Sequence, residues 1–199
     1  REAVDDWVRR LQALPASSVI ELESELSRVT ADVMFRVLFS QPIDGEEASK
    51  VFTAFASFQR LSPQFDLRVV LYSDPSRPQP QPPGLLEEAR QIRGLMERLL
   101  DQRLSRLDAG ERFIDFAQAV LDARDADGQT FSREQMNDQL AVFFLAGHET
   151  TASALAWTFF LLSQQPPWVH QLREETDRML GNQAFGFADF KRLTKARNI

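Results

Sequence analysis

Residues 143–151 read Phe143-Phe144-Leu145-Ala146-Gly147-His148-Glu149-Thr150-Thr151. This stretch places a glycine, an acid and two hydroxyls inside an otherwise apolar run, Leu140 to Leu162, where none of them improves packing. Ser132, with Gln135 three residues later, forms a capping box, which predicts the start of a helix. The helix would continue to Pro166-Pro167 and would be about 50 Å long at about 1.5 Å per residue. We therefore expect one long central helix that crosses the whole domain.

The rest of the chain shows helical periodicity almost throughout, and no strand pattern competes with it. Clusters of proline, glycine and serine divide it into about eight predicted helices. Their approximate bounds are 1–13, 19–39, 46–61, 85–107, 113–124, 133–165, 168–180 and 187–195. A length of 199 residues is typical of one domain. The sequence thus predicts an all-α fold in which residues 1–199 form a single helical domain.

The charge distribution argues against nucleic-acid binding. The chain has 23 basic and 29 acidic residues, and the two signs alternate along amphipathic segments such as Glu87 to Arg106 instead of forming a basic stripe. The chain contains no cysteine, which removes disulfides, cysteine-based zinc sites and thiol catalysis together. No signal peptide is visible after Arg1, and we expect a cytoplasmic protein.

The apolar run 140–162 is long enough that a membrane span must be considered. However, His148, Glu149 and two threonines lie at its centre, and no basic cluster or aromatic belt flanks it. The other predicted helices are amphipathic and would lose their packing partner if this one entered lipid. A buried central helix is therefore the favoured interpretation, and no membrane partner is expected.

Two other segments each have two interpretations. The aromatic side of the predicted helix 46–61 is favoured as core packing, but it is also suited to the wall of an apolar substrate cavity. Residues 73–84 carry five prolines, which favour an extended connection that serves as a linker or a lid. A ligand for proline-binding domains is the alternative for this second segment.

Within the central helix, Thr150 shares one face with residues three, four and seven positions away. These residues are Phe143, Ala146, Gly147, Ala154 and Trp157. The small ones leave room for a flat group beside the helix, and the Thr150 hydroxyl can bond the carbonyl of Ala146. Glu149 lies about 100° around the axis. A carboxylate in so apolar a stretch is costly unless it is paired, hydrated or protonated, and proton transfer is one reason to retain it.

Each of these residues also has a purely structural interpretation. Gly147 could serve close helix packing, Thr150 could only bond its own helix, and Glu149 could pair with a buried arginine. His148 is more often a core residue than a ligand, and the zinc-protease signature would need a second histidine where Ala152 stands. For any one residue the structural interpretation is favoured. The combination at the centre of a very long helix is much more specific.

The six residues from Ala146 to Thr151 match, at every defined position, the pattern Ala or Gly, Gly, any residue, Asp or Glu, Thr, and Thr or Ser. The chain thereby resembles the cytochrome P-450 superfamily, the haem-thiolate monooxygenases. The similarity extends to Asp115 to Leu121 with Asp127-Gly128, and to Gln165-Pro166 with Val169 to Glu175. Before Leu107 it is weaker and lies chiefly in the order and length of the helices.

The resemblance implies roles for six residues of the central helix. It assigns Thr150 to a hydrogen bond with the oxygen that the haem binds and Glu149 to the relay of protons from solvent, which makes both candidate catalytic residues. Ala146, Gly147 and Thr150 are the candidate residues for contact with the haem. Phe143 and Ala154 are candidates to border the substrate.

The resemblance also implies the partners of the intact protein. These are a haem cofactor, an apolar small-molecule substrate, and a redox partner that is a ferredoxin or a flavoprotein reductase. Residues 73–84 fall where this family places the mobile roof of its substrate channel, which strengthens the interpretation of that segment as a lid.

The Phe-x-x-Gly-x-x-x-Cys-x-Gly loop that holds the haem in this superfamily is missing from the sequence, and no Glu-x-x-Arg pair stands before such a loop. The resemblance therefore covers only the helical middle of the fold. We expect a fragment of a larger single-domain haem enzyme that has no metal ligand, holds no haem and is inactive alone. The alternative is a non-catalytic helical remnant that self-associates, as a homo-oligomer, through its exposed apolar faces.

Overall fold

The computed structural model describes residues 1–43, 46–62, 82–181 and 183–198. Within these ranges the chain forms eight α-helices and one 3-10 helix, and the only extended pairing described is an isolated bridge between Arg124 and Thr130. The helices are α1 (Glu2–Gln12), α2 (Leu22–Phe39), α3 (Glu46–Leu61), α5 (Leu85–Asp108), α6 (Phe116–Asp122), α7 (Arg133–Ser163), α8 (Pro166–Leu180), η1 (Phe187–Lys191) and α9 (Thr194–Arg197). The predicted all-α fold is confirmed.

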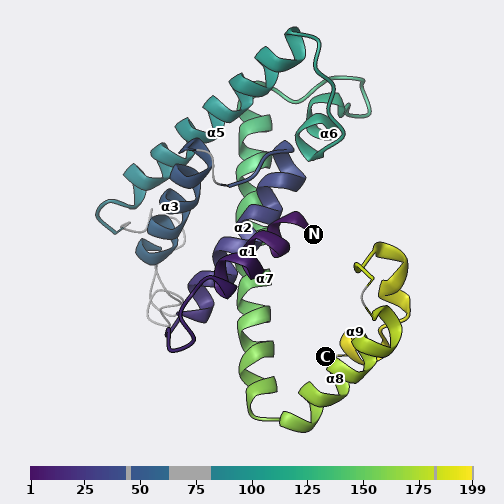
Figure 1. Ribbon diagram of the computed structural model, residues 1–199. Helices are drawn as coiled ribbons and strands as arrows, with labels where there is room; N and C mark the ends of the chain where they lie inside the picture. The colour runs from purple at the N-terminus through teal and green to yellow at the C-terminus, as the bar shows by residue number, and fades with distance from the viewer. Residues whose placement is uncertain (44–45, 63–81, 182, 199) are drawn as a thin grey trace, which may run out of the picture.

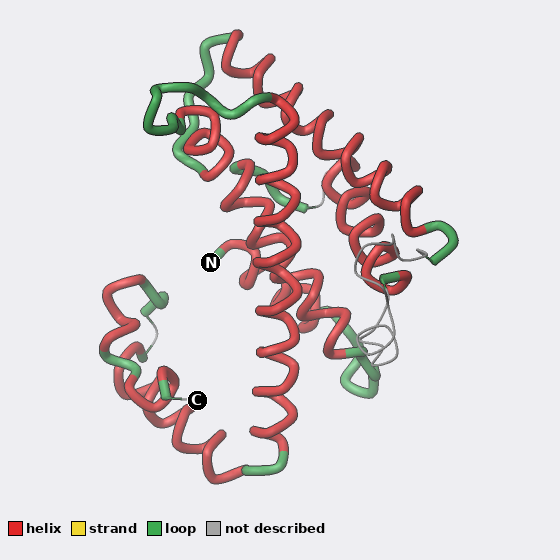
Figure 2. Tube along the Cα trace, turned by 180° about the vertical axis from the view of Figure 1, so that it is seen from behind, coloured by secondary structure: helices red, strands yellow, loops and turns green. Residues whose placement is uncertain are grey.

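Helix α7 is the central element, as the sequence predicts, and α2 lies along it in both views (Figures 1 and 2). The predicted capping box begins it: the Gln135 N–H donates to Ser132 Oγ, and the Ser132 N–H donates to Gln135 Oε1. The sequence predicts that Pro166 and Pro167 precede the next helix, but in the structure they form its first turn. The first turn of a helix tolerates proline because its N–H groups have no helical partner there.

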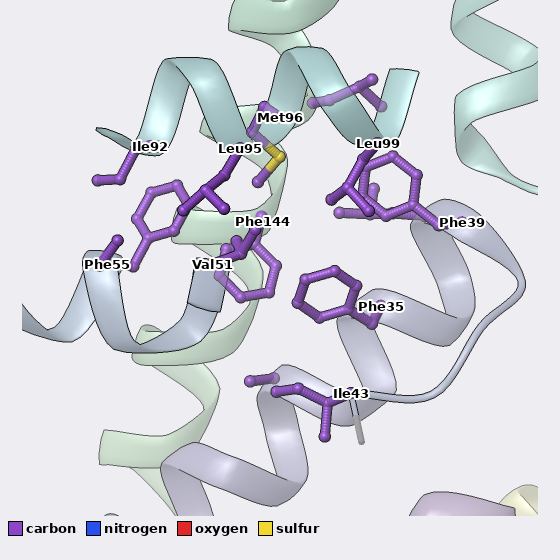
Figure 3. Packing of buried hydrophobic residues seen from close by; sticks show 14 of the residues in the cluster. Phe35, Phe39, Ile43, Val51, Phe55, Ile92, Leu95, Met96, Leu99 and Phe144 are labelled. Atoms are coloured by element: carbon purple, nitrogen blue, oxygen red, sulfur yellow. The ribbon is translucent and has the colours of Figure 1, made fainter. Parts of the chain in front are cut away.

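The main core lies where α2, α3, α5 and α7 meet (Figure 3). Phe144 of α7 packs edge-on against Phe35 of α2, with ring centroids 5.0 Å apart, and lies 4.9 Å from Phe55 of α3. Helix α5 closes this cluster with Met96 and three leucines, all buried. Each such side chain stabilises the fold by about 1.5–3 kcal/mol relative to leaving it exposed. The aromatic side of α3 therefore belongs to the core, which is the favoured of its two interpretations.

A buried ion pair, which the sequence analysis does not predict, ties the ends of three helices together. Arg103 of α5 donates to both carboxylate oxygens of Asp115, at 2.8 and 2.6 Å, and to the carbonyl of Phe39 at the end of α2. Asp115 also accepts from the Ser40 hydroxyl and from the Gln118 N–H, which makes it the N-cap of α6. Burial alone would raise the pKa of Asp115, but these hydrogen bonds together lower it.

Helices α8, η1 and α9 form a separate arm that turns back from the end of α7 and stands away from the other helices (Figures 1 and 2). The arm is held internally by Glu175 of α8. Its carboxylate accepts the backbone N–H groups of Lys195 and Ala196 and the Thr194 hydroxyl at the start of α9. The bond from Lys195 is the largest cause of a lowered Glu175 pKa, partly opposed by burial. In place of the last predicted helix, 187–195, the structure has two short helices, η1 and α9.

Two other helix boundaries differ from the prediction. Helix α2 begins at Leu22 rather than near residue 19, and α6 covers Phe116–Asp122 rather than 113–124 because Asp115 caps it. Of the proline-rich segment 73–84, all but residues 82–84 lie outside the described residues, so the lid prediction is untested. Within the described ranges, no helix combines the length and the apolar character needed to cross a membrane.

Candidate functional site

Four of the six residues predicted to form the site lie on one exposed face of α7, together with Trp157. Phe143, Ala146, Thr150, Ala154 and Trp157 are all exposed, with 43% of Phe143 and 66% of Trp157 accessible. The spacing of three and four residues places them above one another along the helix. The opposite face is buried and is formed by Asn137, Leu140, Phe144, His148 and Ala152. The predicted buried central helix is therefore buried along one face, and its other face is exposed.

Gly147 lies between these two faces and contacts α2. A Cβ atom at this position would overlap the Sδ and Cε atoms of Met34. The space at Gly147 is therefore already filled by a side chain of the protein, which supports the structural interpretation of this glycine as a site of close helix packing. The open surface next to Thr150 is bounded instead by Ala146 and Ala154.

The Thr150 hydroxyl bonds its own helix. Thr150 Oγ1 donates to the Ala146 carbonyl at 2.7 Å, as the sequence predicts, and Thr151 Oγ1 donates to the Gly147 carbonyl at the same distance. A hydroxyl has one proton and two lone pairs, so Thr150 Oγ1 can still accept a hydrogen bond while it donates. Because Thr150 is exposed, those lone pairs can be reached from outside the helix.

Glu149 is exposed beside this face. Within the part of the chain that the structure describes, no basic side chain forms an ion pair with it, so its interpretation as the partner of a buried arginine gains no support. Exposure explains how an acid is retained in this apolar stretch, since water hydrates the carboxylate. A hydrated carboxylate next to Thr150 can exchange protons with solvent.

His148 is a core residue. Only 1% of it is accessible; its ring stacks on Phe144 with centroids 4.6 Å apart, and Phe52 and Phe55 meet it edge-on. Burial lowers the pKa of His148, although a hydrogen bond to the Phe144 carbonyl and the charge of Glu149 oppose this. The neutral ring with its proton on Nδ1 fits the geometry, because Nδ1 lies 2.9 Å from the Phe144 carbonyl oxygen. His148 thus anchors α7 in the core.

The carbonyl of His148 also receives a bond from α2. Thr30 Oγ1, in a residue that is only 6% accessible, lies 2.9 Å from this oxygen. Thr30 and Met34 are one helical turn apart on α2, and both contact the backbone of the motif in α7. The sequence analysis identifies neither residue, because their periodicity shows only that they face a partner and not which partner it is.

The fold and this face define an all-α protein whose central helix presents a hydroxyl and a carboxylate beside a strip of small side chains. The Cytochrome P450 family model matches residues 1–197. The chain belongs to the cytochrome P-450 family.

Individual relatives have moderate identity. Over 185 residues the chain is 27% identical to Cytochrome P450 72A15 of Arabidopsis thaliana, an alignment that covers 92% of this chain and 36% of the relative. Over 200 residues it is 30% identical to cyclooctatin synthase of Streptomyces melanosporofaciens, with 94% of this chain and 40% of the relative covered. A third, Protein LUTEIN DEFICIENT 5, chloroplastic, of Arabidopsis thaliana, is 27% identical over 208 residues, which cover 96% of this chain and 34% of that protein. The chain spans only about a third of the length of these relatives.

Proteins of this family use haem, and the residues of the exposed face fit one side of such a group. Ala146, Thr150 and Ala154 present only small side chains on two successive turns, so a flat ring meets no protruding atoms there. Phe143 and Trp157 mark the two ends of this strip. These residues cannot supply a thiolate ligand to the iron, because the 199 residues contain no cysteine.

Proposed function

We propose that these residues form the oxygen-side middle part of a longer cytochrome P-450 monooxygenase, which inserts one oxygen atom of dioxygen into an apolar organic substrate. The observation that carries the proposal is the common exposed face of Phe143, Ala146, Thr150, Ala154 and Trp157 on α7. Membership of the family supports it. Residues 1–199 would act as one helical domain with the remaining part of the enzyme.

The haem, when bound, supplies the activation of dioxygen. Ala146, Thr150 and Ala154 would lie against its face, and the thiolate ligand would come from residues outside these 199, since they include no cysteine. Gly147 contributes indirectly, because its lack of a side chain lets Met34 of α2 approach. These residues alone are expected to be inactive.

Thr150 and Glu149 have different roles in proton transfer. Thr150 Oγ1, which lies 2.7 Å from the Ala146 carbonyl oxygen and donates its proton to it, gives that proton to a reacting oxygen atom when the bond is exchanged. Glu149, which is exposed, takes protons from water and resupplies the hydroxyl. Phe143, about two turns before Thr150, provides an apolar border for the substrate, together with Ala154.

Replacement of Glu149 by Gln in the complete enzyme tests the relay. We expect product formation to slow by about 100-fold, the lower range for loss of a general acid or base. Glu134→Gln is the matched control, because Glu134 lies on the same helix and its side chain is exposed, but it pairs with Arg93 far from Thr150. Equal rates in the two variants would remove Glu149 from the relay.

The partners of the complete enzyme are also part of the proposal. They are an apolar small-molecule substrate and an electron donor that is a ferredoxin or a flavoprotein reductase. A cytoplasmic location is proposed with them. Reduction of the haem-loaded enzyme by a ferredoxin system, compared with a flavoprotein reductase, identifies the donor class.

A different observation supports a second function, self-association of the chain. Helix α7 exposes several large apolar side chains around its axis, which favour association in water. They are Val142, Phe143, Trp157, Phe159, Phe160 and Leu161. On this proposal the chain is a non-catalytic helical remnant that forms homo-oligomers. Light scattering on the purified chain tests it: a mass of two or more chains supports self-association, and a monomer at high concentration contradicts it.

A further inference from the structure

Three consecutive carbonyls of the motif in α7 each accept a hydrogen bond from a hydroxyl in addition to their place in the helix. The carbonyls of Ala146 and Gly147 accept from Thr150 and Thr151 of the same helix. The third carbonyl, that of His148, accepts from Thr30 of α2. The two bonds within α7 are of the kind that bends a helix locally, whereas the bond from Thr30 ties the motif to α2. The backbone geometry of the motif is therefore set partly by α2.

The Thr30 hydroxyl has three acceptors within reach and only one proton. Its distances are 2.8 Å to the Leu26 carbonyl, 3.1 Å to that of Ser27 and 2.9 Å to that of His148. The first two bonds stay within α2, whereas the third joins the two helices. That third bond is possible only if α2 and α7 approach closely at this point.

Gly147 and Met34 provide that close approach. Gly147 directly precedes His148, and Met34 lies one turn beyond Thr30 on α2. Because Gly147 has no Cβ, the Met34 side chain lies against the α7 backbone. The two contacts are next to each other, so together they fix both the distance between the helices and the rotation of α7 about its axis.

We propose that Thr30 and Met34 are positioning residues for Thr150. By fixing α7 at Gly147 and His148, they keep the Thr150 hydroxyl on the exposed face with its bond to the Ala146 carbonyl. The importance of positioning Thr150 for the reaction rests on the proposed function. The positioning itself is a property of these residues that needs no haem to be observed.

The test uses the 199-residue chain without haem, labelled at threonine methyl groups and backbone amides for NMR. Thr30→Val removes the hydroxyl at nearly constant volume. We expect it to shift the methyl resonance of Thr150 and to accelerate hydrogen exchange at the Thr151 and Ala152 amides by about tenfold, the factor expected for loss of one hydrogen bond. Thr30→Ser, which retains the hydroxyl, should leave both close to the original values.

Thr53→Val is the matched control, because Thr53 also bonds a carbonyl four residues earlier, that of Ser49, but is exposed on α3. Changes in Thr30→Val that stay within α2 and leave Thr150 unmoved would overturn the proposal. If Thr30→Val does not fold, the same two NMR measurements are made on Met34→Ala, with Met179→Ala on α8 as its control. A shifted Thr150 resonance together with an unaltered reaction in Thr150→Ala enzyme would preserve the positioning and refute the proposed function.

Discussion

The side chain of Met34 occupies the position that a Cβ atom of residue 147 would need. Gly147→Ala therefore forces the two groups apart, and overpacking of this kind costs about 1–3 kcal/mol. Alanine is at the same time better than glycine in a helix by about 1 kcal/mol. We expect a net loss of about 1 kcal/mol in the free energy of unfolding, measured in urea.

In a Met34→Ala background the same substitution should stabilise the chain by about 1 kcal/mol, because only the helix preference remains. Gly94→Ala on α5 is the control, since a Cβ there would meet only the Arg98 guanidinium at 3.8 Å, an ordinary contact. It should be stabilising in either background. Additive effects of Gly147→Ala and Met34→Ala would show that the two residues do not interact.

Asp115→Asn tests the buried junction of α2, α5 and α6. Only 3% of the Arg103 side chain and 2% of the Asp115 side chain are accessible, so the variant leaves a buried guanidinium without its anion. Removal of one member of a buried ion pair costs about 3–5 kcal/mol. Glu111→Gln, which breaks the exposed pair with Arg106, should change the free energy of unfolding little. A similar small effect for both would mean that Arg103 finds other partners.

Acid should destabilise the chain through His148. Its pKa is lowered in the folded state by burial, whereas the unfolded chain has the usual value near 6.5. Between these two values the unfolded state binds more protons, so stability increases with pH and levels off above about pH 6.5. His148→Phe should remove this part of the pH dependence of unfolding. His170→Gln should keep it, because His170 is exposed on α8 beside Glu174; loss of the dependence there would contradict the assignment.

The sequence predicts the helices of this fold well because clusters of proline, glycine and serine separate them. The capping box of Ser132 and Gln135, for example, marks the start of α7. Boundaries were wrong where a distant residue decides them: α6 begins where Asp115 caps it, and Asp115 is held by Arg103 from α5.

The site was predictable in its composition but not in its surroundings. Periodicity places Thr150, Ala146 and Ala154 on one face, and the structure exposes them together. Periodicity cannot show that Met34 fills the space beside Gly147, because pairing of helices far apart in the sequence depends on tertiary packing.

In the proposed function the Thr150 hydroxyl transfers protons to the oxygen that reacts. The most direct test of this role is the ratio of product formed to dioxygen consumed in the complete, haem-containing enzyme with Thr150→Ala. Thr151→Ala is the control, because Thr151 is the next residue, is also exposed and makes the same bond to its own helix at 2.7 Å. We expect Thr150→Ala to lower this ratio by about tenfold or more, and Thr151→Ala to leave it near the original value. An unchanged ratio in Thr150→Ala would contradict the proposed role of Thr150.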